Sequence, residues 1–210
     1  TVEDPEPKFG LAIVGEVDPR NLLRNSDFRE NDLLILTKKL GVGVITTAIK
    51  KQESTKEATD AAIESMLRLN DQAAEIAIEV GATGATDITG FGLLGHLGRA
   101  ARESKVDIEI DVAEVPLLPD ARKLALAGNL PGGSQRNLEW IEERVDAGFV
   151  EDIDVHLLAD AQTSGGLVFG VQPAEAETAL KKLLETGHDA AVIGRMDSGS
   201  GLIRLLNPQK

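Results

Sequence analysis

The stretch ATDITGFGLLGHLGRAARESKVDIEIDV, residues 85–112, places a glycine-rich turn, a helical pattern and a strand pattern in direct succession. Residues 91–103 carry apolar side chains at helical spacing, which predicts an amphipathic helix. Residues 105–112 alternate between apolar and polar, which predicts a half-buried strand whose Asp107, Glu109 and Asp111 share one solvated face. A helix that runs directly into such a strand favours a fold in which helices pack against a sheet.

The same patterns extend outward along the chain. Residues 55–80 predict one long helix, which Gly81 ends. Further helices are predicted after Gly41 and Gly43 and over 119–127, 138–147, 154–160 and 173–187, and strands over 9–18, 32–37, 167–171, 189–196 and 201–206. Because strands and helices do not alternate strictly, the order predicts an α+β fold, a mixed sheet packed with helices.

Length and composition predict one domain with an aliphatic core. The acidic stretch TVEDPEPK, residues 1–8, contains two prolines and predicts a flexible lead-in, and residues 9–210 predict a single α+β domain. Five Phe, one Trp and no Tyr leave the core to aliphatic side chains. His156 and His188 have no carboxylate or histidine partner at metal-binding spacing and are expected at the surface, whereas Trp140 is expected in the core.

Charge and cysteine content exclude several classes of function. The net charge of −13 argues against binding to nucleic acid or to an anionic membrane, because both repel an acidic protein. The chain has no cysteine and therefore no disulfide, thiolate metal site or cysteine nucleophile. No apolar run approaches the roughly 18 residues that span a bilayer, so a cytoplasmic protein is expected.

The glycine-rich turn GFGLLG, residues 90–95, matches the G-x-G-x-x-G pattern of dinucleotide-binding loops. The helix that such a loop must open is predicted, with Thr89 as its cap and Asp111 downstream as a candidate ribose ligand. The buried parallel strand that must precede it is missing, because VGATGATDIT contains no run of β-branched residues. Dinucleotide binding is therefore a weak alternative.

Asp87 admits two interpretations. A carboxylate at the start of a helix can cap backbone N–H groups and interact favourably with the helix dipole. It can equally serve as a hard oxygen ligand to Mg²⁺, which takes one or two carboxylates and leaves its other positions to water and phosphate. His96, in the helix that follows, is expected to have a capping or helix-face role.

Three further segments combine hydroxyl side chains with closely spaced glycines: residues 37–43, 131–137 and 162–166. Such loops expose successive N–H groups and let an anion approach the backbone. Arg136 could add a forked phosphate contact, and Asn137 could cap the helix predicted after it. Each segment alone is an ordinary turn, but four of them in one domain indicate an anion-binding cleft.

Together these segments resemble the C-terminal half of the selenophosphate synthetase (selenide, water dikinase) family. The resemblance rests on LTKKLGVGVITTA, ATDITGFGLLGH, PGGSQRN and QTSGG, which occur in the family's order, and it extends to GLAIVGEVDP and AAVIGRM. It runs from about residue 9 to about residue 205 and implies the aminoimidazole ribonucleotide synthetase type of C-terminal domain. Lys39, Ala161 and Ser134 depart from the residues usual in the family.

The resemblance implies an ATP-dependent enzyme that makes selenophosphate, phosphate and AMP from ATP, selenide and water, with Mg²⁺. Asp87 matches the family's metal-binding aspartate of this half, and no residue is expected to be catalytic by itself. The phosphate cleft would be lined by Thr86, Thr89, Gly90, Gly132, Gly133, Arg136, Thr163 and Gly165.

The family's nucleotide loop, its reactive cysteine or selenocysteine and most of its metal aspartates belong to an N-terminal half that this chain lacks. The chain alone is therefore expected to be inactive, with nucleotide and selenide brought by that half and a homodimer allowed. A stand-alone binding or regulatory domain of the same fold is the alternative.

Overall fold

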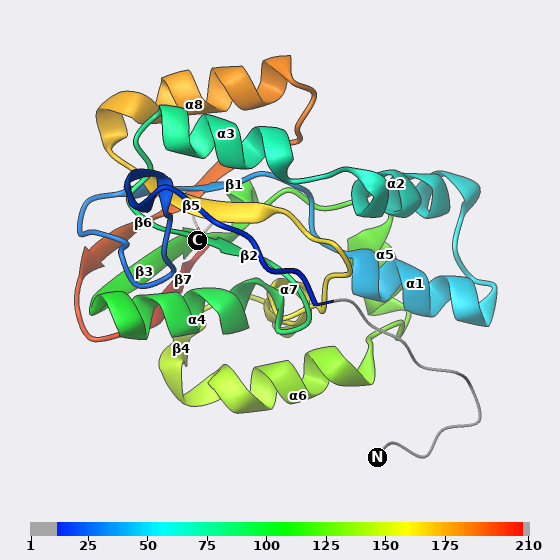
Figure 1. The fold of residues 1–210 in the computed structure, drawn as a ribbon. Helices are drawn as coiled ribbons and strands as arrows, with labels where there is room; N and C mark the ends of the chain where they lie inside the picture. The colour runs from blue at the N-terminus through cyan, green and yellow to red at the C-terminus, as the bar shows by residue number, and fades with distance from the viewer. Residues whose placement is uncertain (1–11, 208–210) are drawn as a thin grey trace.

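The computed structural model describes residues 12–207, and its centre is a seven-stranded mixed sheet in the order β2-β5-β1-β6-β3-β7-β4 (Figure 1). The strands β2, β5, β1, β6 and β3 pair antiparallel, whereas β7 and β4 continue the sheet in parallel. The bounds are β1 Leu33–Leu36, β2 Ala85–Asp87, β3 Val106–Asp111, β4 Val145–Asp146, β5 Leu167–Val171, β6 Ala191–Ser198 and β7 Ile203–Leu206. The predicted α+β fold with a mixed sheet is confirmed.

Helices cover both faces of the sheet. Figure 1 shows α3 (Asp71–Glu79) and α8 (Pro173–Glu185) on one face, α4 (Gly92–Ser104) and α6 (Gly132–Ile141) on the other, and α1 (Val42–Lys51), α2 (Lys56–Leu67) and α5 (Ala121–Leu126) beyond one end. The helix α7 (Asp152–Leu158) packs with α4 and α5. Strand β1 supplies Leu34 and Leu36 to the core under α4 and Ile35 to the core under α3 and α8. The apolar run of β1 therefore follows from burial on both faces.

The helix predicted over residues 55–80 is two helices in the structure. The helix α2 packs in the cluster with α1 and α5, whereas α3 packs under β1 and β5 on the sheet. One straight helix cannot reach both cores, and the chain breaks between them at Arg68–Asn70. The buried Lys38 fixes the break, because its Nζ donates to the carbonyl oxygens of Ser65 at 3.2 Å and Arg68 at 2.7 Å.

Four other sequence predictions are corrected. The segment 131–137 was expected as a loop before a helix at 138–147, but α6 already begins at Gly132 and ends at Ile141. Of the strand expected over 9–18, residues 12–18 form no strand, and the remainder lies outside the described residues, as does the lead-in 1–8. Trp140 is exposed and His188 is buried, the reverse of what was expected for each.

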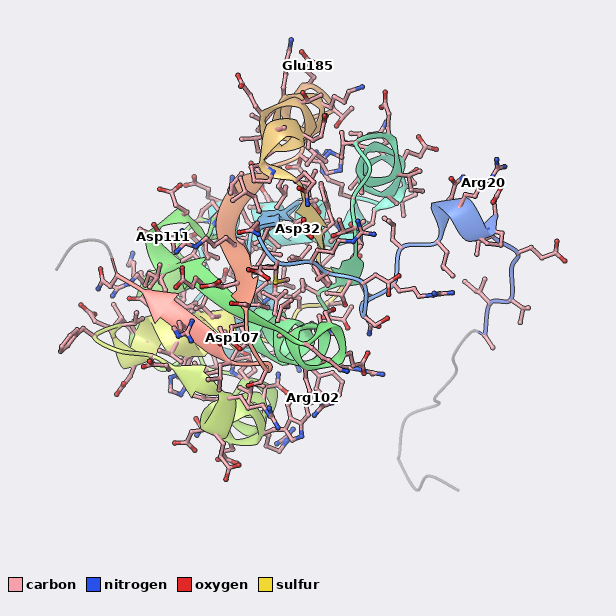
Figure 2. All side chains as sticks on the ribbon, turned by 90° about the vertical axis from the view of Figure 1, so that its left-hand side faces the viewer. Arg20, Asp32, Arg102, Asp107, Asp111 and Glu185 are labelled. Carbon is pink, nitrogen blue, oxygen red and sulfur yellow. The ribbon has the colours of Figure 1, made fainter. Side chains whose placement is uncertain are left out.

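Asp107 is also buried, although it was expected on a solvated face of β3; Glu109 and Asp111 on that face are half-buried. Oδ1 of Asp107 accepts hydrogen bonds from the backbone N–H groups of Ser200, Gly201 and Leu202 at 2.8, 3.1 and 3.0 Å. Its Oδ2 accepts one from Arg204 at 3.0 Å. Ser200, Gly201 and Leu202 connect β6 to β7 across the end of β3, which lies between the two strands. The Asp107 carboxylate therefore fixes this crossover (Figure 2).

The pKa of Asp107 predicts how acid acts on this crossover. Burial alone would raise this pKa, but the three N–H groups and Arg204 hold it below its usual value. Its contribution to the free energy of unfolding is therefore present above the unfolded-state pKa of about 3.9 and is lost as the pH falls through the lowered value. Asp107→Asn should cost about 1–3 kcal/mol at neutral pH, and the difference from wild type should shrink in acid.

Urea unfolding at a series of pH values measures this effect. The matched control is Asp111→Asn on the same strand. Its carboxylate accepts a backbone hydrogen bond from Ala113 at 3.1 Å, so this change should cost less. Equal losses in the two variants at neutral pH would contradict the role assigned to Asp107.

Candidate functional site

The buried carboxylate of Asp160 joins three of the four glycine-containing segments. Its Oδ2 accepts hydrogen bonds from the N–H groups of Gly43 at 2.9 Å and Val44 at 3.3 Å, in the first turn of α1. Its Oδ1 accepts one from the hydroxyl of Ser134 in α6 at 3.0 Å, and Gln162 Nε2 donates to Oδ2 at 3.0 Å. We call this cluster, Gly43, Val44, Ser134, Asp160 and Gln162, the Asp160 junction.

The fourth segment, residues 85–96, is held to the junction through the loop at 162–166. The backbone N–H of Ile88 donates to the Gly166 carbonyl at 2.8 Å, and that of Gln162 donates to the Thr89 carbonyl at 3.0 Å. Gly165 is buried with its α-carbon against the Ile88 carbonyl group, where no side chain fits. The structure therefore brings together all four segments that the sequence singled out.

Asn137 ties α6 to the same region instead of capping a helix. It lies inside α6, and its Nδ2 donates to the carbonyl oxygens of Gly90 at 2.8 Å and Ala159 at 3.3 Å. The expected capping role was wrong because the helix starts earlier. These bonds, with the Ser134 hydroxyl bond to Asp160, anchor α6 through side chains within its first two turns.

Lys38 is a second buried anchor. Besides Ser65 and Arg68, its Nζ donates to the carbonyl oxygen of Ser164 at 2.9 Å, so all three of its donors are used within the protein. Burial, and then the charge of Arg68, lower its pKa. We assign Lys38 to holding the 162–166 loop against the end of α2.

Asp87 is the last residue of β2, and its side chain is exposed. No hydrogen bond or ion pair to its carboxylate is found among residues 12–207. It does not cap α4, because that helix begins at Gly92 and its N-cap, Phe91, makes no side-chain capping bond. Of the two interpretations of Asp87, the capping role is therefore not observed.

The residues around Asp87 fit a single contribution to a metal site. Within the described part of the chain, no cluster of three or more Asp, Glu, His or Cys side chains could hold a metal ion by itself. Mg²⁺ commonly takes one or two protein carboxylates and fills its octahedron with phosphate oxygens and water. One free, exposed carboxylate fits that pattern, provided that the phosphates and the other ligands come from elsewhere.

His96 positions the backbone just after Asp87. Its Nε2 lies 3.1 Å from both the backbone N and the hydroxyl of Thr89, so the ring holds the turn that precedes α4. Burial has the largest effect on the pKa of His96 and lowers it. The charge of Asp87 raises this pKa and the charge of Arg99 lowers it, and the net result is a lowered pKa. When the ring is neutral, Nε2 can accept the hydrogen bond that the backbone N–H of Thr89 donates.

The glycines of GFGLLG do not form a dinucleotide loop. The strand before them, β2, is a three-residue edge strand antiparallel to β5, whereas a dinucleotide loop follows a buried parallel strand. Gly92 has φ +66° and packs against the backbone of Ala159, so the chain needs glycine there for conformation and space.

The remaining residues predicted for a phosphate cleft differ in accessibility. Gly90, Gly132, Arg136 and Thr163 are exposed, and Thr86, Thr89 and Gly133 are half-buried. Only Gly165 is buried. Asp160 is not among the residues predicted from the sequence, although an acidic residue inside the apolar run VHLLADA is the available signal for a buried, hydrogen-bonded carboxylate.

Residues 29–206 match the family described as AIR synthase related protein, C-terminal domain. The chain is similar to the selenide, water dikinase of Caldanaerobacter subterraneus subsp. tengcongensis, with 45% identity over 199 residues that cover 93% of this chain and 57% of the relative. It is 41% identical over 208 residues to the selenide, water dikinase of Porphyromonas gingivalis, covering 98% of this chain and 60% of that one. The chain thus spans less than two thirds of the length of these relatives.

Solved structures show the same fold at low sequence identity. The hydrogenase maturation protein HypE of E. coli matches with a TM-score of 0.64 and 20% identity over 89% of this chain and 49% of that one. Thiamine-monophosphate kinase from Stenotrophomonas maltophilia K279a matches with a TM-score of 0.61 and 16% identity over 87% of this chain and 52% of that one. Among the described residues, no helix is both long and apolar enough to cross a membrane.

The Asp160 junction predicts a distinctive dependence of stability on pH. Burial raises the pKa of Asp160 to about 6, although its hydrogen bonds lower it. The folded protein therefore holds this proton more tightly than the unfolded chain, and the free energy of unfolding falls as the pH rises from about 4 to about 6. This group should contribute a fall of about 3 kcal/mol across that window.

The measurement is urea unfolding from pH 4 to pH 7, the range set by the two pKa values. Asp160→Asn keeps an acceptor oxygen and cannot titrate, so its curve should lack this fall. Superimposable slopes for the two proteins would contradict the assignment.

Two glycines at matched positions test how tightly the junction is packed. Gly43 and Gly133 are each the second residue of a helix, in α1 and α6. A methyl group on Gly43 would overlap the Asp160 carboxylate, so Gly43→Ala should cost about 1–3 kcal/mol. Gly133 has open space, so Gly133→Ala should gain up to about 1 kcal/mol through helix propensity.

Thermal unfolding of the two glycine variants is the measurement. A loss of stability at both positions would indicate general intolerance of alanine rather than close packing at Asp160.

Proposed function

The chain belongs to the AIR synthase related protein family, as its C-terminal domain, and from this premise we propose that it is the C-terminal half of a selenide, water dikinase. The parent enzyme is a cytoplasmic phosphotransferase that converts ATP, selenide and water into selenophosphate, phosphate and AMP. Relatives of that name at 40–45% identity, matched over 93–98% of this chain, support the proposal. The N-terminal half would bring the nucleotide and the selenide.

The observation that carries the proposal is the free carboxylate of Asp87 beside an otherwise fully hydrogen-bonded junction. In the junction, Asp160 and Gln162 are committed to internal bonds, whereas Asp87 at the end of β2 is exposed and unpaired among the described residues. A buried scaffold that presents one unpaired acid is suited to hold that acid at a fixed position for an external ligand.

We assign to Asp87 one ligand position on a Mg²⁺ ion that also binds the phosphates of ATP. Bound there, the ion would neutralise charge on the phosphoryl oxygens. Within this chain, five residues are accessible enough to border the phosphates: Thr86, Gly90, Gly132, Gly133 and Thr163. The guanidinium of Arg136, which is exposed on α6, would add a phosphate contact. Thr89, which contacts His96, and Gly165, which packs against Ile88, would support this surface from within the protein.

The test is ATP-dependent AMP formation by a full-length chimera that joins this chain to the N-terminal part of its Caldanaerobacter relative. Asp87→Asn removes the charge and keeps the shape, and it should lower the rate roughly a hundredfold or more, because several kcal/mol of charge stabilisation depend on the metal. Raising the Mg²⁺ concentration should recover part of the loss.

Two controls make the result interpretable. Glu177→Gln, an exposed change on α8, should leave the rate unchanged, and the chain without the N-terminal part should form no AMP. Full activity of the Asp87→Asn chimera would exclude the metal-ligand role. AMP formation by the chain alone would exclude the proposed division of the site between two halves.

A further inference from the structure

A groove of about 580 Å³ lies between α4 and α6, on the side of the sheet opposite α3 and α8 (Figure 1). Its lining includes Phe91 and His96 from the start of α4 and Arg102 farther along it. From α6, Arg136 and Trp140 complete the other wall. The volume is within the range of about 300–1,000 Å³ typical of small-molecule sites.

Two aromatic rings at this groove are exposed to solvent. Phe91 is 61% and Trp140 58% exposed, and their ring centroids are 6.3 Å apart with planes inclined by 34°. Trp140 was expected in the core, so its position needs an explanation. An exposed aromatic pair presents flat faces on which another planar ring can stack.

The groove also gathers positive charge in an acidic protein. Arg99 is paired with Glu103 at 2.8 Å, but neither Arg102 nor Arg136 has a carboxylate partner among the described residues. Figure 2 labels Arg102 in the region between α4 and α6. Because the net charge is −13, carboxylates that could pair with arginine are abundant in this chain. Two guanidinium groups that lack such a partner beside two exposed rings therefore indicate a site for an anionic ligand.

We propose that the α4–α6 groove binds a nucleoside monophosphate. Its base stacks on Trp140 and Phe91, and its phosphate accepts hydrogen bonds from Arg102 and Arg136, whose planar forks suit phosphate oxygens. A single nucleotide fits better than a nucleic-acid strand, because Glu139, Glu142 and Glu143 around the end of α6 would repel further phosphates. This site shares Arg136 with the surface proposed to border the phosphates of ATP, but it needs no metal, so it does not depend on the role proposed for Asp87.

The chain provides its own reporter of binding. Trp140 is the only tryptophan and there is no tyrosine, so excitation at the red edge of the indole band reports on this groove alone. AMP, added without Mg²⁺ to the chain of 210 residues, should quench Trp140 fluorescence saturably. Adenosine should need at least about a tenfold higher concentration than AMP to quench the fluorescence equally. Inorganic phosphate should need at least about a tenfold higher concentration than AMP to displace bound AMP.

Variants that remove a positive or a negative charge from the groove should change AMP affinity in opposite directions, which distinguishes binding at this site from unspecific binding. Arg102→Gln and Arg136→Gln, both at exposed positions, should each weaken AMP binding about tenfold. Glu103→Gln removes a negative charge from the groove and should tighten binding. The control Lys181→Gln removes one positive charge on α8, across the sheet, and should leave the affinity unchanged.

Four outcomes would overturn the proposal. The first is that AMP causes no saturable quenching, and the second is that adenosine quenches as effectively as AMP. The third is that free phosphate displaces bound AMP as effectively as AMP itself does. The fourth is that a single-stranded oligonucleotide quenches the fluorescence whereas AMP does not. Failure of this titration leaves the Asp87 proposal untouched, because AMP formation by the chimera is measured with Mg²⁺ at a different residue.

Discussion

The buried carboxylate of Asp160 is the interaction on which the arrangement of this domain depends. Removing a charged group from water is costly, and here four hydrogen bonds offset that cost incompletely, since the pKa of Asp160 stays raised to about 6. The donors come from α1, from α6 and from the 162–166 loop, so the carboxylate can be satisfied only when all three are in place. A polar group of this kind selects one arrangement of elements over others that would bury as much apolar surface.

Around this junction the domain divides into an internally bonded part and an open part. The side chains of Lys38, Asn137 and Gln162 each donate two or three hydrogen bonds, to backbone carbonyl groups or to the Asp160 carboxylate, so none of these donors is left for a ligand. Asp87 and the rim of the α4–α6 groove carry unpaired charge toward solvent instead. The first set explains why the segments are close together, and the second is where binding is proposed. Fixed scaffolds that carry a few unpaired polar groups are the usual construction of binding sites.

The glycines illustrate why sequence motifs need their structural context. GFGLLG satisfies a dinucleotide-binding pattern, yet Gly92 is required by a positive φ and by contact with Ala159, and Gly165 by contact with Ile88. Both serve close approach between backbone segments of the same protein. The same absence of a side chain that admits a phosphate elsewhere admits a neighbouring loop here. The resemblance of four ordered segments to one family was a stronger guide than any single motif.

The sequence by itself determined the α+β class, strands such as Leu167–Val171, most helices, and the four glycine-containing segments that the structure brings together. These features depend on local periodicity and on turn chemistry. The sequence also singled out Asp87, as an acidic residue at a glycine-rich turn that leads into a helix. Only the tertiary structure decided that residues 55–80 break into two helices, that α6 starts at Gly132, and that Asp107 and His188 are buried while Trp140 is exposed. The break, the position of α6 and the burial of Asp107 each depend on a partner distant in sequence: Lys38 for the break, Asp160 for α6 and the backbone N–H groups of residues 200–202 for Asp107. Side-chain periodicity carries no information about a hydrogen-bond partner a hundred residues away, so burial of these polar groups became visible only once the chain was folded.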